Sequence, residues 1–170
     1  KSADAFLAEL AALTPGDLTY TMFAVSGSEA NERSMQIARQ YWLATGKPSK
    51  HKVISLKGGY HGATMGTFAV CGLPHMAEPY APLFVPGFAK VAPPHPYRDR
   101  GEGTDRELVA RRAAGLREAI QREGPDTVSA VILEPVKSNT WPAGFFAAIR
   151  IDDPALARPP QGEVPPAPVI

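Results

Sequence analysis

The sequence predicts an α/β fold in which helices flank a mainly parallel sheet. Segments with helical periodicity alternate with short apolar segments along most of the 170 residues. The segment TVSAVIL at residues 127–133 forms one continuous, largely apolar run, a pattern typical of a strand covered on both faces. Alternation of this kind favours parallel strands that are connected by helices.

The first 46 residues predict a helix, a strand and a second helix. Residues 1–13 have apolar positions at helical spacing, and a Thr-Pro-Gly triplet follows them as a stop signal. The apolar run at residues 20–25 predicts a short buried strand. The next helix is predicted from about residue 29 to residue 45, with Gly46 as its C-terminal cap. One face of this helix is expected to carry Ala30, Ser34, Ile37, Ala38, Tyr41 and Ala44.

The middle of the chain continues this alternation. Residues 52–56 predict a second strand, and residues 63–70 are compatible with a helix. Seven of the 18 prolines fall between positions 74 and 96, which predicts one long loop there. A helix then begins at the capping box of Thr104 and Glu107 and ends before a Gly-Pro pair. Its apolar stripe is expected to consist of Val109, Ala113, Leu116 and Ile120.

Composition and charge exclude several classes of protein. Eighteen basic and 17 acidic residues give a net charge of +1, and no basic stripe favours nucleic acid or a membrane surface. No apolar run is long enough to span a bilayer, and no basic-then-apolar leader is present. The single cysteine, Cys71, fits a reducing compartment and is expected to be a small buried apolar group. We therefore expect a cytoplasmic protein, and Lys1 in place of Met indicates a piece of a longer chain.

A polar cluster directly follows each of the three predicted strands. Ser26-Gly27-Ser28-Glu29 follows the first, Gly58-Gly59-Tyr60-His61-Gly62 follows the second, and Glu134-Pro135 follows the third. In open α/β sheets, ligands bind beyond the carboxyl ends of the strands. If the strands are parallel, all three clusters should meet at one edge of the sheet.

The first cluster allows two interpretations. Gly27 lets the backbone approach a ligand closely, and Ser26 and Ser28 add hydroxyl donors at the start of a helix, which together suit a phosphate. Alternatively, Ser26 and Glu29 are only a capping box. The spacing by itself leaves both interpretations open.

The other two clusters are also ambiguous when they are taken one at a time. Tyr60 could stack on a planar ligand and His61 could transfer a proton, or Tyr60 could pack on the sheet edge with His61 at the surface. Glu134 could pair with an arginine or face the ligand edge. No second histidine or carboxylate stands at ligand spacing from His61, which argues against a metal site.

Taken together, the clusters resemble one known family. The stretches FAVSGSEANE at 23–32, ARQY at 38–41, GYHG at 59–62 and EPV at 134–136 are similar to those of class III aminotransferases. These omega-aminotransferases belong to the fold-type-I enzymes that depend on pyridoxal 5'-phosphate (PLP). The resemblance covers about residues 3–136, so we expect residues 1–136 to be part of that family's large domain.

The resemblance implies roles at the matching positions. The amides of Gly27 and Ser28 and the Ser28 hydroxyl would hold the PLP phosphate, with Ser26 behind them. Tyr60 would lie against the pyridine ring, and His61 would shape its loop. Glu134 would lie near the ring or the substrate amine. Members of the family are homodimers that move an amino group from an amine or omega-amino acid to a keto acid such as pyruvate or 2-oxoglutarate.

Two elements of the family pattern are not found in this sequence. The Asp-Glu-Val strand expected after Glu134 is missing, and no lysine follows Lys137 to serve as the Schiff-base lysine. The resemblance therefore implies a chain that is inactive alone. Residues 137–170 are divergent and rich in proline, and we expect a poorly ordered tail there. A lost reading frame near Val136, an incomplete gene product and a natural disordered tail are the hypotheses for it.

Two other functions are compatible with the same residues. A non-catalytic module could use the sheet edge to bind PLP or another phosphorylated ligand, or could dimerise with an intact relative. A nucleotide-binding Rossmann domain is disfavoured, because the turn at Ser26-Gly27-Ser28 does not have the G-x-G-x-x-G spacing and no Walker motif occurs.

Overall fold

The computed structural model describes residues 2–14, 19–95, 97–99 and 103–134. The expected tail at 137–170, with Pro135 and Val136, therefore lies outside the described residues. The elements in chain order are α1 (Ala3–Leu13), α2 (Gly27–Ala44), β1 (Lys52–Leu56), α3 (Met65–Val70), α4 (Pro74–Ala77), the 3-10 helix η1 (Glu78–Leu83), β2 (Phe88–Val91), α5 (Asp105–Glu123) and β3 (Val128–Val131).

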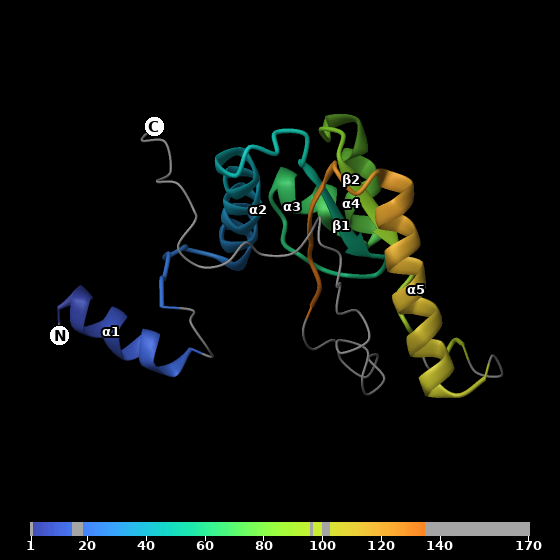
Figure 1. Cartoon of the computed structure of the whole chain (residues 1–170), viewed down its shortest axis with the longest axis horizontal. Coiled ribbons are helices and arrows are strands. Elements are labelled where there is room, and N and C mark those ends of the chain that lie inside the picture. The colour runs from blue at the N-terminus through green and yellow to red at the C-terminus, as the bar shows by residue number, and fades with distance from the viewer. Residues whose placement is uncertain (1, 15–18, 96, 100–102, 135–170) are drawn as a thin grey trace.

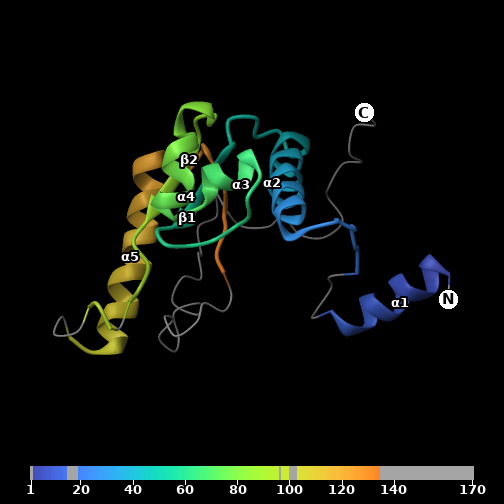
Figure 2. The same ribbon diagram turned by 180° about the vertical axis from the view of Figure 1, so that it is seen from behind.

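The three described strands form one parallel sheet in the order β2-β1-β3. Helices α2 and α5 lie on opposite sides of it, as the two views in Figures 1 and 2 show. The central strand β1 is nearly covered on both faces, as its apolar sequence KVISL predicts. The predicted α/β architecture with parallel strands is confirmed.

The apolar core lies between α5 and one face of the sheet. Ile54 and Leu56 point to this face because side chains alternate along a strand. All four residues of the predicted stripe on α5 are buried, and the core cluster as a whole contains Ile54, Leu56, Val91, Val109, Leu116, Ala119, Ile120 and Val128. On the other face the Ser55 hydroxyl donates to the Val70 carbonyl at 2.7 Å, which connects α3 to β1.

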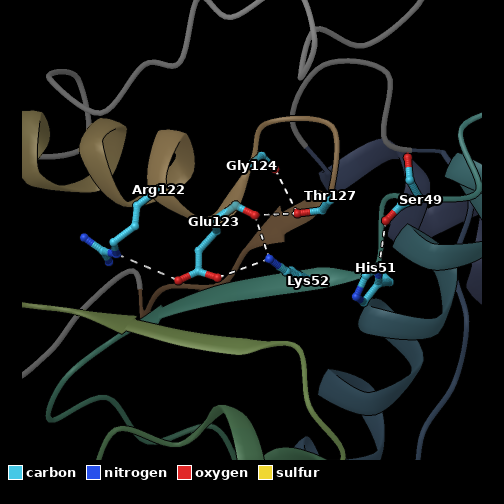
Figure 3. Close-up of polar contacts among 7 residues, drawn as sticks. All are labelled: Ser49, His51, Lys52, Arg122, Glu123, Gly124 and Thr127. Carbon is cyan, nitrogen blue, oxygen red and sulfur yellow. Dashed lines mark hydrogen bonds and ion pairs between the residues drawn. The ribbon is translucent and has the colours of Figure 1, made fainter.

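The C-terminal end of α5 is fastened to the start of the sheet by a compact set of polar contacts (Figure 3). The Lys52 ammonium donates to the Glu123 carbonyl at 2.6 Å and pairs with the Glu123 carboxylate at 3.3 Å. The Thr127 hydroxyl donates to the same carbonyl at 2.7 Å. Gly124, at φ +89°, makes the turn between these groups. These contacts fix the turn that connects α5 to β3.

Two sequence-based predictions about strands were wrong. Residues 20–25 do not form a strand, and Tyr20 and Val25 are 98% and 96% exposed. Among the described residues only β2 and β3 pair with β1, and this segment pairs with neither edge of the sheet, although a strand needs such a partner. The expected loop at 74–96 contains α4, η1 and β2, which lies on an edge of the sheet where flanking prolines are tolerated.

The predicted face of α2 is only partly covered. Ala38, Tyr41 and Ala44 are partly buried and Ala30, Ser34 and Ile37 are exposed. The buried residue of this helix is Trp42, which was not among them. The Trp42 indole donates to the Ser129 carbonyl at 2.7 Å, so the helix is rotated to direct this indole at β3. Periodicity alone does not decide between two apolar faces of one helix.

The N-terminus of α5 has the predicted capping box. The Glu107 amide donates to the Thr104 hydroxyl at 3.3 Å, and the Thr104 amide donates to the Glu107 carboxylate at 2.7 Å. The hydrogen bonds from the Thr104 amide and hydroxyl hold the pKa of the Glu107 carboxyl below its ordinary value of 4.5.

Replacing Glu107 by Gln should therefore have a pH-dependent effect on stability. A carboxyl with a lowered folded pKa stabilises the fold fully above its ordinary pKa of 4.5, and this contribution disappears as the pH falls through the lowered value. We expect Glu107→Gln to lower the urea midpoint at neutral pH, with a difference from the original chain that shrinks below 4.5. The exposed Glu118→Gln on the same helix is the control. A difference for Glu107→Gln that stays constant with pH would contradict this role.

None of the helices among the described residues is both long and apolar enough to cross a membrane. The cysteine Cys71 is fully buried, as predicted, and its thiol donates to the Gly59 carbonyl at 3.3 Å. This contact places the end of α3 against the segment that follows β1.

Candidate functional site

The structure brings the first two polar clusters together, although the strand expected before the first cluster does not form. The Ala63 amide donates to the Ser28 hydroxyl at 3.0 Å. The Asn31 side-chain amide donates to the His61 carbonyl at 2.7 Å, and the Thr64 hydroxyl donates to the Glu32 carboxylate. The N-terminal turns of α2 are thus held against residues 61–64 by several hydrogen bonds.

The start of α2 is capped and also open to solvent. The Glu29 amide donates to the Ser26 hydroxyl at 3.2 Å, and the Val25 amide donates to the Glu29 carboxylate at 2.9 Å. Ser26 is therefore the N-cap of α2, but the complete capping box is not formed, because the Glu29 carboxylate accepts from Val25 and not from Ser26. This cap does not use the amides of Gly27 and Ser28, which have no acceptor among the described residues. No atom lies within 4 Å of a Cβ built on Gly27, so the space beside this turn is open.

The segment from Gly58 to Gly62 presents one ring outward and the other inward. Tyr60 is 47% exposed, whereas His61 is 4% exposed. The interpretation in which Tyr60 packs on the sheet edge and His61 lies at the surface is therefore wrong, because the two rings have the opposite arrangement. Gly62 has φ +129°, and a Cβ there would lie 2.6 Å from the Ser28 hydroxyl oxygen. A glycine is needed at position 62 for this loop to approach α2.

His61 and Glu134 converge beneath Gly59. A Cβ built on Gly59 would lie 3.1 Å from His61 Nε2 and 3.8 Å from Glu134 Oε2. Glu134 of the third polar cluster, three residues beyond β3, therefore lies close to His61 of the second cluster, with Gly59 between them. Within the part of the chain that the structure describes, no group of three or more His, Cys, Asp or Glu side chains is arranged to hold a metal ion.

Sequence reasoning assigned no role to Asn31 and Glu32, although both belong to the stretch that carries the resemblance. The structure shows that they fasten α2 to residues 61–64. A Cβ on Gly66 would lie 3.0 Å from Glu32 Oε1, so α3 also passes close to this carboxylate. The signal in the sequence was a polar helix face, because positions 28, 31, 32 and 35 share one side of a helix.

The geometry offers an anion site with an aromatic ring nearby. Two amides at the open end of an 18-residue helix attract negative charge, and the Ser28 hydroxyl can donate its proton while its oxygen accepts from Ala63. A family model described as aminotransferase class-III matches residues 1–150. The chain belongs to the class-III aminotransferases. The matched range runs past Val136, where the resemblance was expected to stop.

Relatives of this aminotransferase chain agree in sequence and in fold. A probable aminotransferase of Mycobacterium tuberculosis is 43% identical over 145 residues, which cover 83% of this chain and 31% of that protein. A thermostable (S)-enantioselective omega-transaminase from Thermomicrobium roseum has a TM-score of 0.81 and 39% identity, over 86% of this chain and 33% of that one. A PMP-bound aminotransferase from Vibrio fluvialis has a TM-score of 0.78 and 34% identity, over 88% and 34%.

These comparisons confirm the family and the expected α/β fold, which forms part of the PLP-dependent transferase fold. The chain spans about a third of the length of the class-III aminotransferases that it matches. The described residues thus correspond to one section of a larger aminotransferase architecture.

Proposed function

We propose that this chain provides the part of a class-III aminotransferase that binds the phosphate and ring of PLP. The observation that carries the proposal is the open first turn of α2, whose unused amides of Gly27 and Ser28 lie beside a solvent-facing space. A phosphate dianion suits these amides because the helix dipole and the free N–H groups both favour negative charge. When it is bound, PLP supplies the electron sink that amino-group transfer requires.

The remaining site residues have supporting roles in this proposal. The exposed ring of Tyr60 would lie against the face of the cofactor. His61 would hold the loop that carries Tyr60, since its carbonyl accepts from Asn31 and its ring is buried below Gly59. Glu134 would contribute a carboxylate near the ring or the substrate amine. Ser26 acts indirectly, because its hydroxyl caps α2 and so keeps the first turn formed.

The proposed reaction is transfer of an amino group from an amine or omega-amino acid to a keto acid of the pyruvate or 2-oxoglutarate class. The complete enzyme would be a homodimer, as expected for the family. The 170-residue chain assayed alone should not turn over, because no lysine follows Lys137 to form the Schiff base. Binding of PLP is therefore the function to measure on this chain.

Ser28→Ala should weaken the binding of PLP to the chain. The substitution removes a hydroxyl donor to the phosphate, and a charge-assisted hydrogen bond of this kind corresponds to roughly a tenfold change in Kd. Binding is measured by titration with PLP, followed by the absorbance of the cofactor and checked by competition with inorganic phosphate.

Ser34→Ala is the matched control, because Ser34 lies on the exposed side of the same helix and its hydroxyl donates to the Ala30 carbonyl. It should leave the Kd for PLP unchanged. Equal affinities of both variants and the original chain would reject the assignment of Ser28. Inorganic phosphate that fails to compete would reject the proposed phosphate site as a whole.

A further inference from the structure

A second cavity lies beyond the carboxyl ends of β1 and β2. It has a volume of about 850 Å³, and its walls include Lys57, the first residue after β1, and Pro93, which follows β2. Gly72 and Leu73, Pro74 at the start of α4 and Glu78 at the start of η1 also line it. Figures 1 and 2 show α4 beside β1 and β2 in both views. A cavity of this size suits a small organic ligand rather than a bare ion.

The charged groups of this cavity are unbalanced. Its lining contains the cations of Lys57, Lys90 and Arg98 but the single carboxylate of Glu78. No ion pair joins any of the three cations to a carboxylate among the described residues. The Arg98 amide donates to Nδ1 of His95 at 3.3 Å, so the turn that carries Arg98 is held at the rim by a second lining residue.

Lys90 is the most constrained of the three cations. Its ammonium is partly buried on β2 and donates to the Ala69 carbonyl at 2.9 Å. Burial lowers the pKa of Lys90, and the nearby Cys71 only partly opposes this effect. A nearby anion stabilises the charged form of a partly buried ammonium, because it compensates for the hydration that burial removes.

Much of the remaining lining is apolar. Leu73, Pro74, Pro93 and Pro94 contribute hydrocarbon walls, and the rigid proline rings lose little entropy when a ligand packs on them. Apolar walls also exclude water and thereby strengthen the attraction between an entering anion and the cations. The pocket thus combines positive charge with an apolar surface.

We propose that this pocket binds a small organic dianion, either a phosphate ester or a dicarboxylate, whose apolar body packs against the leucine and proline walls. The anionic groups would contact Lys57, Lys90 and Arg98. This binding function goes beyond the proposed PLP site, because the pocket is lined by β2, by the segments that follow β1 and β2, and by the first residues of α4 and η1. It uses neither the first turn of α2 nor Tyr60.

The test uses the 170-residue chain and three probes of similar size. Phthalate represents a dicarboxylate, phenyl phosphate a phosphate ester, and benzyl alcohol a neutral molecule with the same ring. The phenyl phosphate arm is run on the original chain and on Ser28→Ala, so that binding at the start of α2 is recognised by its weakening in that variant. Affinity is measured by calorimetry, and the location of binding by amide chemical shifts at Gly58 and Gly72, which line the pocket.

The variants are Lys57→Gln and Arg98→Gln, with Lys47→Gln and Arg122→Gln as matched controls. The controls are exposed cations outside the pocket, and Arg122 lies at the opposite end of the sheet (Figure 3). We expect each pocket variant to weaken binding of the dianion roughly tenfold, as loss of one charge-assisted contact implies. The controls should change the Kd by less than about twofold, because exposed charges contribute little.

Saturable binding of phthalate or phenyl phosphate with these differences supports the proposal, and the better probe identifies the class of dianion. It is overturned if neither probe saturates, if benzyl alcohol binds equally well, or if pocket and control variants respond alike. Circular dichroism checks that each variant is folded. The PLP titration of the same variants is a separate measurement, so failure of the PLP site and failure of this pocket give different results.

Discussion

Gly62→Ala should destabilise the fold by roughly 3 kcal/mol and abolish binding at the start of α2. The residue has φ +129°, a backbone conformation that side-chain-bearing residues rarely adopt. The new Cβ would lie 2.6 Å from the Ser28 hydroxyl oxygen, 2.7 Å from the Thr67 hydroxyl oxygen and 2.9 Å from the Ser28 Cα. The Cα belongs to the backbone and cannot rotate away, so the loop and the helix must separate. Urea unfolding measures the free energy, and PLP titration measures the site.

Two other glycines distinguish the two causes of the lost stability, which are backbone strain at positive φ and the steric clash with α2. Gly46 has φ +74° with no atom within 4 Å of a built Cβ, so Gly46→Ala reports the backbone strain alone, about 1 to 2 kcal/mol. Gly27 has neither a positive φ nor a close neighbour, so Gly27→Ala should change stability little. A Gly62→Ala variant no less stable than Gly46→Ala would show that the close approach to Ser28 is absent in solution.

Trp42→Ala should lower the free energy of unfolding by about 4 kcal/mol, the usual cost of removing a buried aromatic side chain. The side chain is only 5% exposed, and its indole donates to the Ser129 carbonyl at 2.7 Å. The Lys50 ammonium lies 4.6 Å from the ring centroid, which adds a cation–π contact. Trp42 thus connects the C-terminal half of α2 to β3. Thermal and urea unfolding of the variant give the measurement.

Trp42→Phe and Leu43→Ala serve as controls for this effect. The phenylalanine keeps an apolar ring but leaves the Ser129 carbonyl without its indole donor, which should cost about 1 to 2 kcal/mol. Leu43 is exposed on the neighbouring position, so its truncation should change stability by less than about 0.5 kcal/mol. Similar losses for Trp42→Ala and Leu43→Ala would mean that α2 does not pack on the sheet through Trp42.

The sequence alone determined the features that depend on neighbours along the chain. The cap at Ser26, the capping box at Thr104 and the apolar stripe on α5 are all correct, because each depends on residues within one or two helical turns. The order of helices and strands follows from the same short-range patterns over most of the chain. The motifs around Gly27 and Gly59 are continuous stretches of sequence, so they also sufficed to identify the family.

Only the tertiary structure decided which segments find partners. The run at 20–25 is apolar enough for a strand but pairs with none of the described strands, whereas Phe88–Val91 forms an edge strand despite its proline neighbours. The same holds for the site and for the charged pocket, where residues 30 or more positions apart, such as Asn31 and His61 or Lys57 and Arg98, come together. The physical reason is that local preferences act over a few residues, whereas hydrogen bonding between strands and the close approach at Gly62 depend on groups that the chain brings together only when it folds.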